Sequence, residues 1–150
     1  MRCRAAGFFA EVGDDPPTPQ SFQADLDDLP EGYSRSDECL YRAYGEGLLL
    51  GYAEVLRGFD RPDQWTIGML LVDPVVRSSG IGHAMVEAVA SDACAAGARS
   101  LMAGVITARE RSMAFWHREG FVREVRRHPI VFVGGQESAV VRLERDLQQA

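Results

Sequence analysis

The chain has 150 residues, of which 46% are hydrophobic and 25% are charged, the proportions of an ordinary globular domain. This length suits one domain with a substantial core better than two, so we expect a single domain over residues 1–150. The formal net charge of −6 argues against a nucleic-acid-binding protein, which would carry a basic face. No apolar run reaches the ~18 residues of a membrane-spanning helix, so we expect a cytoplasmic protein without a membrane partner.

Hydrophobic patterning predicts the elements of the first half of the chain. We expect a first strand over residues 2–12 and, after a proline-rich break, a short helix over residues 19–29. Two strands follow at residues 40–44 and 48–56, joined by a hairpin turn with the sequence Gly-Glu-Gly at residues 45–47. A third strand, residues 65–72, comes after a polar tip.

The second half alternates helices and strands. We expect a helix over residues 81–96, because Ile81, Met85, Val89 and Ala93 recur at helical spacing, and Gly97 is a good C-cap. A strand at 100–106, a helix at 108–119, a strand at 121–127, a loop at 128–137 and a last strand at 138–147 complete the chain. This order predicts a three-layer α/β fold with a mixed central sheet.

The most informative feature is the turn after the third strand, with the sequence R-S-S-G-I-G at residues 77–82. Glycines let backbone N–H groups face a ligand, and the helix that begins there adds unpaired N–H groups and the positive end of its dipole. Such a turn predicts a phosphate site. A nucleotide P-loop is excluded because the chain contains no lysine, and a dinucleotide fingerprint is excluded because Met85 stands where its third glycine would be.

This turn resembles motif A of the Gcn5-related N-acetyltransferase (GNAT) superfamily. The resemblance rests on R-x-x-G-x-G at residues 77–82, preceded by a strand and Asp73-Pro74 and followed by a helix. In that family motif A holds the pyrophosphate of acetyl-coenzyme A, which would be the cosubstrate here. The element order matches the GNAT fold over residues 40–147, whereas the first forty residues match its usual opening poorly.

Residues 109–121 resemble motif B of the same family. Members often show Asn, then Ala, then Phe-Tyr, and end on Gly-Phe. Phe115, Gly120 and Phe121 match this pattern. The chain departs from it where Arg109, Ser112 and Trp116 replace the usual Asn, Ala and Tyr.

The resemblance implies a cosubstrate site made largely of backbone groups. In the family, the strand before motif A separates from its neighbour and exposes backbone groups to the pantetheine arm and the acetyl oxygen. The residues implied to bind acetyl-CoA are Leu70, Leu71, Val72, Arg77, Ser78, Ser79, Gly80, Ile81, Gly82, His83, Arg109 and Trp116. No metal is expected, because Cys3, Cys39 and Cys94 lack the C-x-x-C spacing of a metal or redox site.

The leaving thiolate would benefit from a proton donor, a role that the motif-B tyrosine has in many family members. The indole N–H of Trp116 donates a hydrogen bond but is not a usable acid, so we interpret Trp116 as a packing residue beside the cofactor. Ser112 lies one helical turn earlier on the same face and is the candidate donor. His117 and His128 stay open as alternatives, although we expect His117 to face solvent and His128 to lie in a surface loop.

The general base is expected on the central strands, where family members often carry a glutamate. On the strand at 65–72 the only polar side chain is that of Thr66, which is not a base. Glu54 on the preceding strand is the candidate, and alternation places it on the face shared with Tyr52 and Leu56. A solvent-exposed edge would explain a glutamate there equally well.

We therefore expect an N-acetyltransferase that moves an acetyl group from acetyl-CoA to a primary amine of a small molecule, amino acid or peptide N-terminus. Direct attack in a ternary complex is expected, because no cysteine is placed as an acyl carrier. The alternatives are a non-catalytic acyl-CoA sensor, favoured by Trp116, and a partner-binding domain. The acidity of residues 11–38 favours a cationic acceptor. The family resemblance suggests a homodimer, with residues 130–133 as an interface or a pocket lining.

Overall fold

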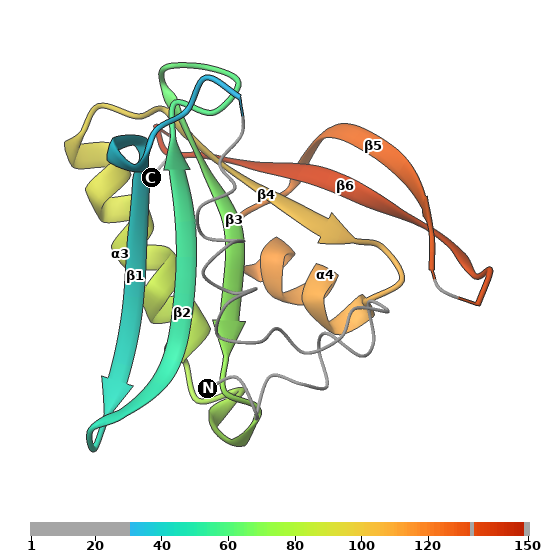
Figure 1. The fold of residues 1–150 in the computed structure, drawn as a ribbon, viewed down its shortest axis with the longest axis horizontal. Helices are drawn as coiled ribbons and strands as arrows, with labels where there is room; N and C mark the ends of the chain where they lie inside the picture. Colours follow the sequence, from blue (N-terminus) through green and yellow to red (C-terminus); the bar gives the residue numbers. More distant parts are fainter. Residues whose placement is uncertain (1–30, 133, 149–150) are drawn as a thin grey trace.

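A computed structural model describes residues 31–132 and 134–148. Six strands form one sheet in the order β1-β2-β3-β4-β6-β5 (Figure 1). The strands are β1 (Glu38–Gly45), β2 (Leu48–Arg57), β3 (Gln64–Val72), β4 (Ser100–Ile106), β5 (Arg123–Val131) and β6 (Glu137–Asp146). The helices are α3 (Ile81–Ala95) and α4 (Glu110–Arg118), with short 3-10 helices at Arg35–Asp37 and Pro74–Val76.

The sheet is mixed, as the sequence predicts. β3 and β4 run parallel, whereas the other neighbouring strands pair antiparallel. The α/β class and the mixed central sheet are therefore confirmed. The strand predicted over residues 2–12 and the helix predicted over residues 19–29 lie outside the described residues. No helix in the described part of the chain is long and apolar enough to cross a bilayer.

Both described helices cover the same face of the sheet. Alternate residues of β4, namely Leu101, Ala103 and Val105, belong to one buried cluster with Val86 of α3 and Trp116 of α4. Because alternate residues of a strand face the same side, α3 and α4 lie on one face, which we call the helical face. Met102 and Gly104 of β4 therefore lie on the opposite face.

Local turn chemistry fixes two of the connections as predicted. Glu46 and Gly47 have φ values of 50° and 76°, and two successive positive φ angles are typical of a two-residue hairpin turn. Gly97, with φ 84°, follows the C-cap Ala96 of α3, in the left-handed conformation that commonly ends a helix.

The loop predicted over residues 128–137 is wrong in its first part, because β5 continues to Val131. Pro129 pairs with Ala139 of β6, and a proline is tolerated there because β5 is the edge strand of the sheet. The true turn is shorter, with the N–H of Phe132 donating to the carbonyl of Gln136 at 2.9 Å. His128 accordingly lies in a strand and not in a loop.

Candidate active site

β3 and β4 are paired only over their first halves. Residues 64–67 pair with residues 100–103, and the last pair joins Ile67 to Ala103. Beyond that pair β4 turns away from β3, and α4 occupies the angle between them in Figure 1. Leu70, Leu71 and Val72 lie beyond the last pair, so the edge of β3 that faces β4 has no ladder hydrogen bonds to that strand there.

A β-bulge and two glycines mark the point where the strands separate. Glu54 pairs with Met69 and Val55 pairs with Ile67, so Gly68 is the extra residue of the bulge, which bends a strand locally. Gly104 directly follows the last paired residue of β4. Both glycines are exposed, and neither strand carries a side chain at the start of the gap.

Asp73 holds the chain in place as it leaves β3. Its side chain is at the N-cap of the 3-10 helix Pro74–Val76 and accepts a hydrogen bond from the Val75 N–H at 3.0 Å. Its own N–H donates to the carbonyl of Leu50 on β2 at 2.8 Å, and the residue is 2% exposed. The Asp-Pro pair before the motif therefore fixes the turn against the sheet.

The turn at residues 77–80 leaves the start of α3 open. Gly80 is the N-cap with φ 88°, and no side chain of the described chain caps this helix. The first N–H groups of a helix have no partner within it, and they carry the positive end of its dipole. Arg77 lies beside them, exposed, with its Nε donating to the Val72 carbonyl at 3.3 Å. Such an arrangement is suited to an anion.

Gly82 brings motif A into contact with α4. A Cβ at this position would lie 3.2 Å from two atoms of the Phe115 ring, closer than side chains normally approach, so glycine lets the first turn of α3 pack on Phe115. The predicted motifs A and B are thus neighbours in space.

The imidazole of His83 is turned toward the end of α4. Its Nδ1 lies 2.8 Å from Oε2 of Glu119, a residue that is 9% exposed, and this hydrogen bond raises the pKa of His83. One ligand atom each of His83, Glu87 and Glu119 lies within 4.8 Å of the others. Arg145 Nη1 donates to Glu87 Oε1 at 2.7 Å, so these side chains are already held by ion pairs.

Trp116 is part of the core. It is 7% exposed, and its ring makes edge contacts with Phe115 and Phe121 at centroid distances of 5.2 and 4.9 Å. Ser112 lies one turn earlier and is half-buried, and Arg109 is half-buried at the N-cap of α4, directly after β4. His117 is exposed, which confirms the expectation that it faces solvent.

Glu54 lies on β2 opposite Met69, next to the bulge of β3, and is held by a tyrosine. The Tyr52 hydroxyl donates to Glu54 Oε1 at 2.7 Å, which confirms that the two side chains share a face. Tyr52 is 5% exposed, and its burial, followed by its bond to Glu54, raises the pKa of Tyr52. Sequence reasoning placed Tyr52 on this face but missed its role, which the two-residue spacing indicates.

The two candidate catalytic residues lie on opposite sides of the sheet. Val55 belongs to the core cluster of the helical face, so Glu54 lies on the opposite face, whereas Ser112 is on α4. The gap between β3 and β4 lies between these two sides of the sheet. The bulge at Gly68 was also missed, although a glycine inside a strand pattern is its usual signal.

The sequence matches the acetyltransferase (GNAT) family model over residues 7–121. The chain belongs to this family. The separated strands and the glycine-containing turn before α3 are thus part of a GNAT acetyltransferase domain. No curated protein sequence matches the chain.

Solved structures share this GNAT fold at low sequence identity. An N-acetyltransferase from Staphylococcus aureus Mu50 superposes with a TM-score of 0.72 at 22% identity, covering 97% of this chain and 91% of the other. The ribosomal-protein-S18-alanine N-acetyltransferase from Escherichia coli gives 0.70 at 17%, covering 97% and 86%. A Bacillus subtilis acetyltransferase in complex with CoA gives 0.62 at 21%, covering 74% and 78%.

Proposed function

We propose that this GNAT protein transfers an acetyl group from acetyl-CoA to a primary amine by direct attack in a ternary complex. The observation that carries the proposal is the separation of β3 from β4 directly beside the uncapped first turn of α3. The pyrophosphate would bind the N–H groups of residues 78–83, with Arg77 adding charge. The pantetheine arm would then follow the unpaired edge of β3 at Leu70, Leu71 and Val72 toward the gap.

The reaction needs one bond formed and one broken. The amine nitrogen attacks the thioester carbon, and backbone N–H groups on the free edge of β3 stabilise the oxyanion. Glu54, oriented by Tyr52 at 2.7 Å, would take the proton released by the amine, directly or through water. The C–S bond then breaks, and the CoA thiolate takes a proton from water on the side of α4, directly or through the Ser112 hydroxyl, which water reprotonates as it donates.

Release of free CoA thiol, followed with a panel of amines, tests this proposal. The acidity of residues 11–38 supports cationic acceptors, so polyamines, aminoglycosides and basic peptides should outperform neutral amines. We expect Glu54→Gln to lower kcat by about a hundredfold, the scale of general-base catalysis, with acetyl-CoA affinity unchanged. Glu137→Gln, the same exchange at an exposed position of β6, is the control and should keep full activity.

A second candidate function is a non-catalytic acyl-CoA sensor, because the family's usual tyrosine is replaced by a tryptophan that lies in the core. A sensor would bind acetyl-CoA and release no thiol with any amine of the panel.

A homodimer and a cytoplasmic location also stay proposals. β5 is an edge strand on which Val131 is 68% exposed. A fall of the molecular mass in solution from dimer to monomer on Val131→Glu substitution would support the dimer.

A further inference from the structure

Among the described residues, no close contact and no positive φ angle requires glycine at positions 68 and 104. Neither has a positive φ angle, so neither needs glycine for its backbone conformation. A Cβ at Gly68 would come no closer than 3.9 Å to any described neighbour, the Glu54 carbonyl oxygen, and one at Gly104 would lie 3.7 Å from Val140 Cγ1. Both are ordinary van der Waals distances. At Gly51, by contrast, a Cβ would lie 2.6 Å from Met85 Sδ.

The two glycines lie opposite each other at the start of the gap. Each directly follows a member of the last β3–β4 pair, Ile67 and Ala103. Ile67 and Ala103 face the helices, so alternation directs positions 68 and 104 to the opposite face, where both are exposed. Two side chains are therefore absent at one place, where neither a positive φ angle nor a close contact among the described residues requires glycine.

Apolar side chains lie beside this place, together with Arg142, the register partner of Gly104, and Glu54, the register partner of Met69. Met69 follows Gly68 directly, Met102 lies two residues before Gly104 on the same face, and Val140 contacts the Gly104 position. Flexible thioethers and a branched aliphatic side chain favour an alkyl ligand. If the free edge of β3 holds the thioester as proposed, its alkyl tail would lie near this point.

We infer that Gly68 and Gly104 set the length of the acyl chain that the protein accepts, and that propionyl- and butyryl-CoA bind in addition to acetyl-CoA. This inference rests on the proposed function, because it takes the gap to be the acyl-CoA site. The room left by the two absent side chains takes the extra methylene groups. Each methylene that becomes buried tightens binding by up to about fourfold, so the longer thioesters bind at least as well as acetyl-CoA.

Calorimetric titration of CoA, acetyl-CoA, propionyl-CoA and butyryl-CoA tests the inference without an acceptor. In Gly104→Val, a β-branched side chain that strands favour fills the room. We expect CoA affinity to stay within about twofold, acetyl-CoA affinity to fall slightly, and butyryl-CoA affinity to fall by about tenfold, or 1.4 kcal/mol. Gly68→Ala and Gly104→Ala should act in the same direction with smaller effects, and all three variants should melt near the wild-type temperature.

The outcomes separate this inference from the proposed function. Wild-type protein that binds CoA and acetyl-CoA but binds butyryl-CoA about tenfold more weakly would overturn the inference. Equal weakening of all four ligands in Gly104→Val and Gly104→Ala would do the same, because it reports a distorted site. Failure of the folded wild type to bind any of the four, CoA included, would instead contradict the proposed function and the inference with it.

Discussion

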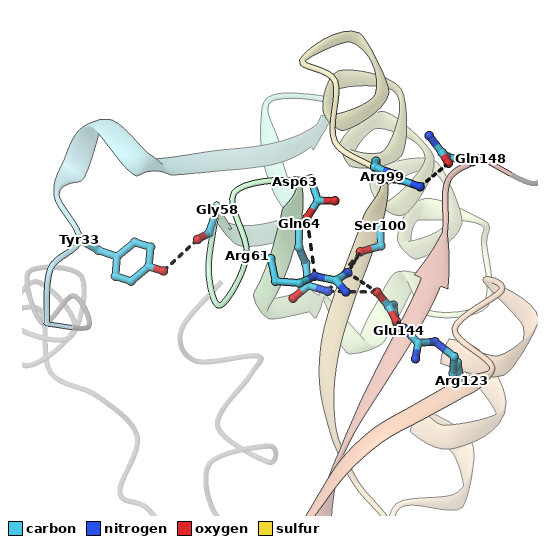
Figure 2. A network of polar contacts seen from close by, with 10 residues as sticks. All are labelled: Tyr33, Gly58, Arg61, Asp63, Gln64, Arg99, Ser100, Arg123, Glu144 and Gln148. Atoms are coloured by element: carbon cyan, nitrogen blue, oxygen red, sulfur yellow. Dashed lines mark hydrogen bonds and ion pairs between the residues drawn. The ribbon is translucent and has the colours of Figure 1, made fainter.

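The two ends of the β3–β4 pair differ along one face of the sheet. At the beginning of the strands, buried Glu144 of β6 accepts hydrogen bonds from Arg61 at 2.7 Å and from Gln64 at 3.2 Å. Gln64 also donates to Ser100 at 3.1 Å, and Arg123 contacts the second oxygen of Glu144. Figure 2 shows these side chains converging from four strands and the loop before β3. Four residues further along β3, Gly68 faces Gly104 across a gap.

Residues 64–67 of β3 and 100–103 of β4, which we call the tied end, are paired, whereas the later residues of the two strands, the open end, are separated. Polar side chains from four strands and the loop at residues 58–63 satisfy one another at the tied end, which stabilises the pairing of β3 with β4. Among the described residues, the open end has no such contacts between the two strands, and β3 and β4 are not paired there. Stability and binding should therefore respond to different residues.

The largest effect on stability should come from removing the carboxylate of Glu144 at the tied end. Glu144→Ala removes a buried carboxylate and leaves Gln64, which is 2% exposed, without one of its partners. We expect a loss of about 3 kcal/mol of unfolding free energy, the lower part of the range for a broken buried ion pair, because its arginines reach solvent. Urea unfolding measures this, with exposed Glu137→Ala on the same strand as control. A change below about 0.5 kcal/mol, or a parallel loss of CoA affinity, would remove the distinction between the two ends.

Restoring the family's tyrosine should not restore an acid at the open end. In Trp116→Tyr the ring would stay among Phe115 and Phe121, so its hydroxyl would be buried in the core. We expect a loss of about 2 kcal/mol in stability from the smaller ring and the buried hydroxyl, with kcat not increased. Trp116→Phe should cost less, since it buries no hydroxyl. A rise in kcat for Trp116→Tyr alone would show that this position faces the thioester.

A smaller change, an increase in stability, is expected at Thr66, which lies between the two ends. Thr66 is 8% exposed, and its hydroxyl has no hydrogen-bond partner among the described residues. Thr66→Val keeps the shape and removes this unpaired group, so we expect the free energy of unfolding to rise by about 1 kcal/mol. Thr107→Val is the control, because that hydroxyl accepts from the Ala139 N–H at 3.2 Å and its removal should destabilise. Destabilisation by Thr66→Val would indicate a partner for this hydroxyl.

The smallest effect is the pH dependence of stability that His83 causes at the start of α3. Glu119 raises the pKa of His83 above 6.5, so the folded state binds a proton more tightly than the unfolded state. The resulting stabilisation is complete below about pH 6.5, the unfolded value, and is lost as the pH rises through the higher folded pKa. The melting-temperature difference between wild type and His83→Gln should therefore shrink from pH 6 to pH 8.5. A difference that grows over this range would have the wrong sign for this ion pair.

Local patterns predicted most of the fold because they depend on neighbours in the chain. The Glu46-Gly47 turn, the start of α3 after Gly80 and its end at Gly97 all follow from backbone chemistry within a few residues. The continuation of β5 through Pro129 did not follow, because a proline indicates a strand only when the strand is known to lie at an edge.

The backbone part of the proposed site could be named from the sequence. Residues 70–72 and 77–83 follow from the R-x-x-G-x-G motif and the family resemblance, whereas the partners of Glu144 are 80 and 83 positions away and no local pattern reveals them. The burial of Trp116 also depends on packing between α4 and the sheet. The proximity of Gly68 to Gly104 could not be predicted without the register of β3 on β4. The two glycines are neighbours because Ile67 is paired with Ala103.

Calorimetric titration with acetyl-CoA tests the central claim, that the open end beside α3 is an acyl-CoA site. Ser78→Glu puts a negative charge on the exposed turn before the helix, and Ser91→Glu puts the same charge on an exposed position in the second half of that helix. A substitution at Gly82 would be less clean, because its side chain would meet Phe115. We predict micromolar binding by the wild type, a loss of about tenfold or more in Ser78→Glu, and little change in Ser91→Glu. No binding by the folded wild type, or equal binding by both variants, would contradict the account.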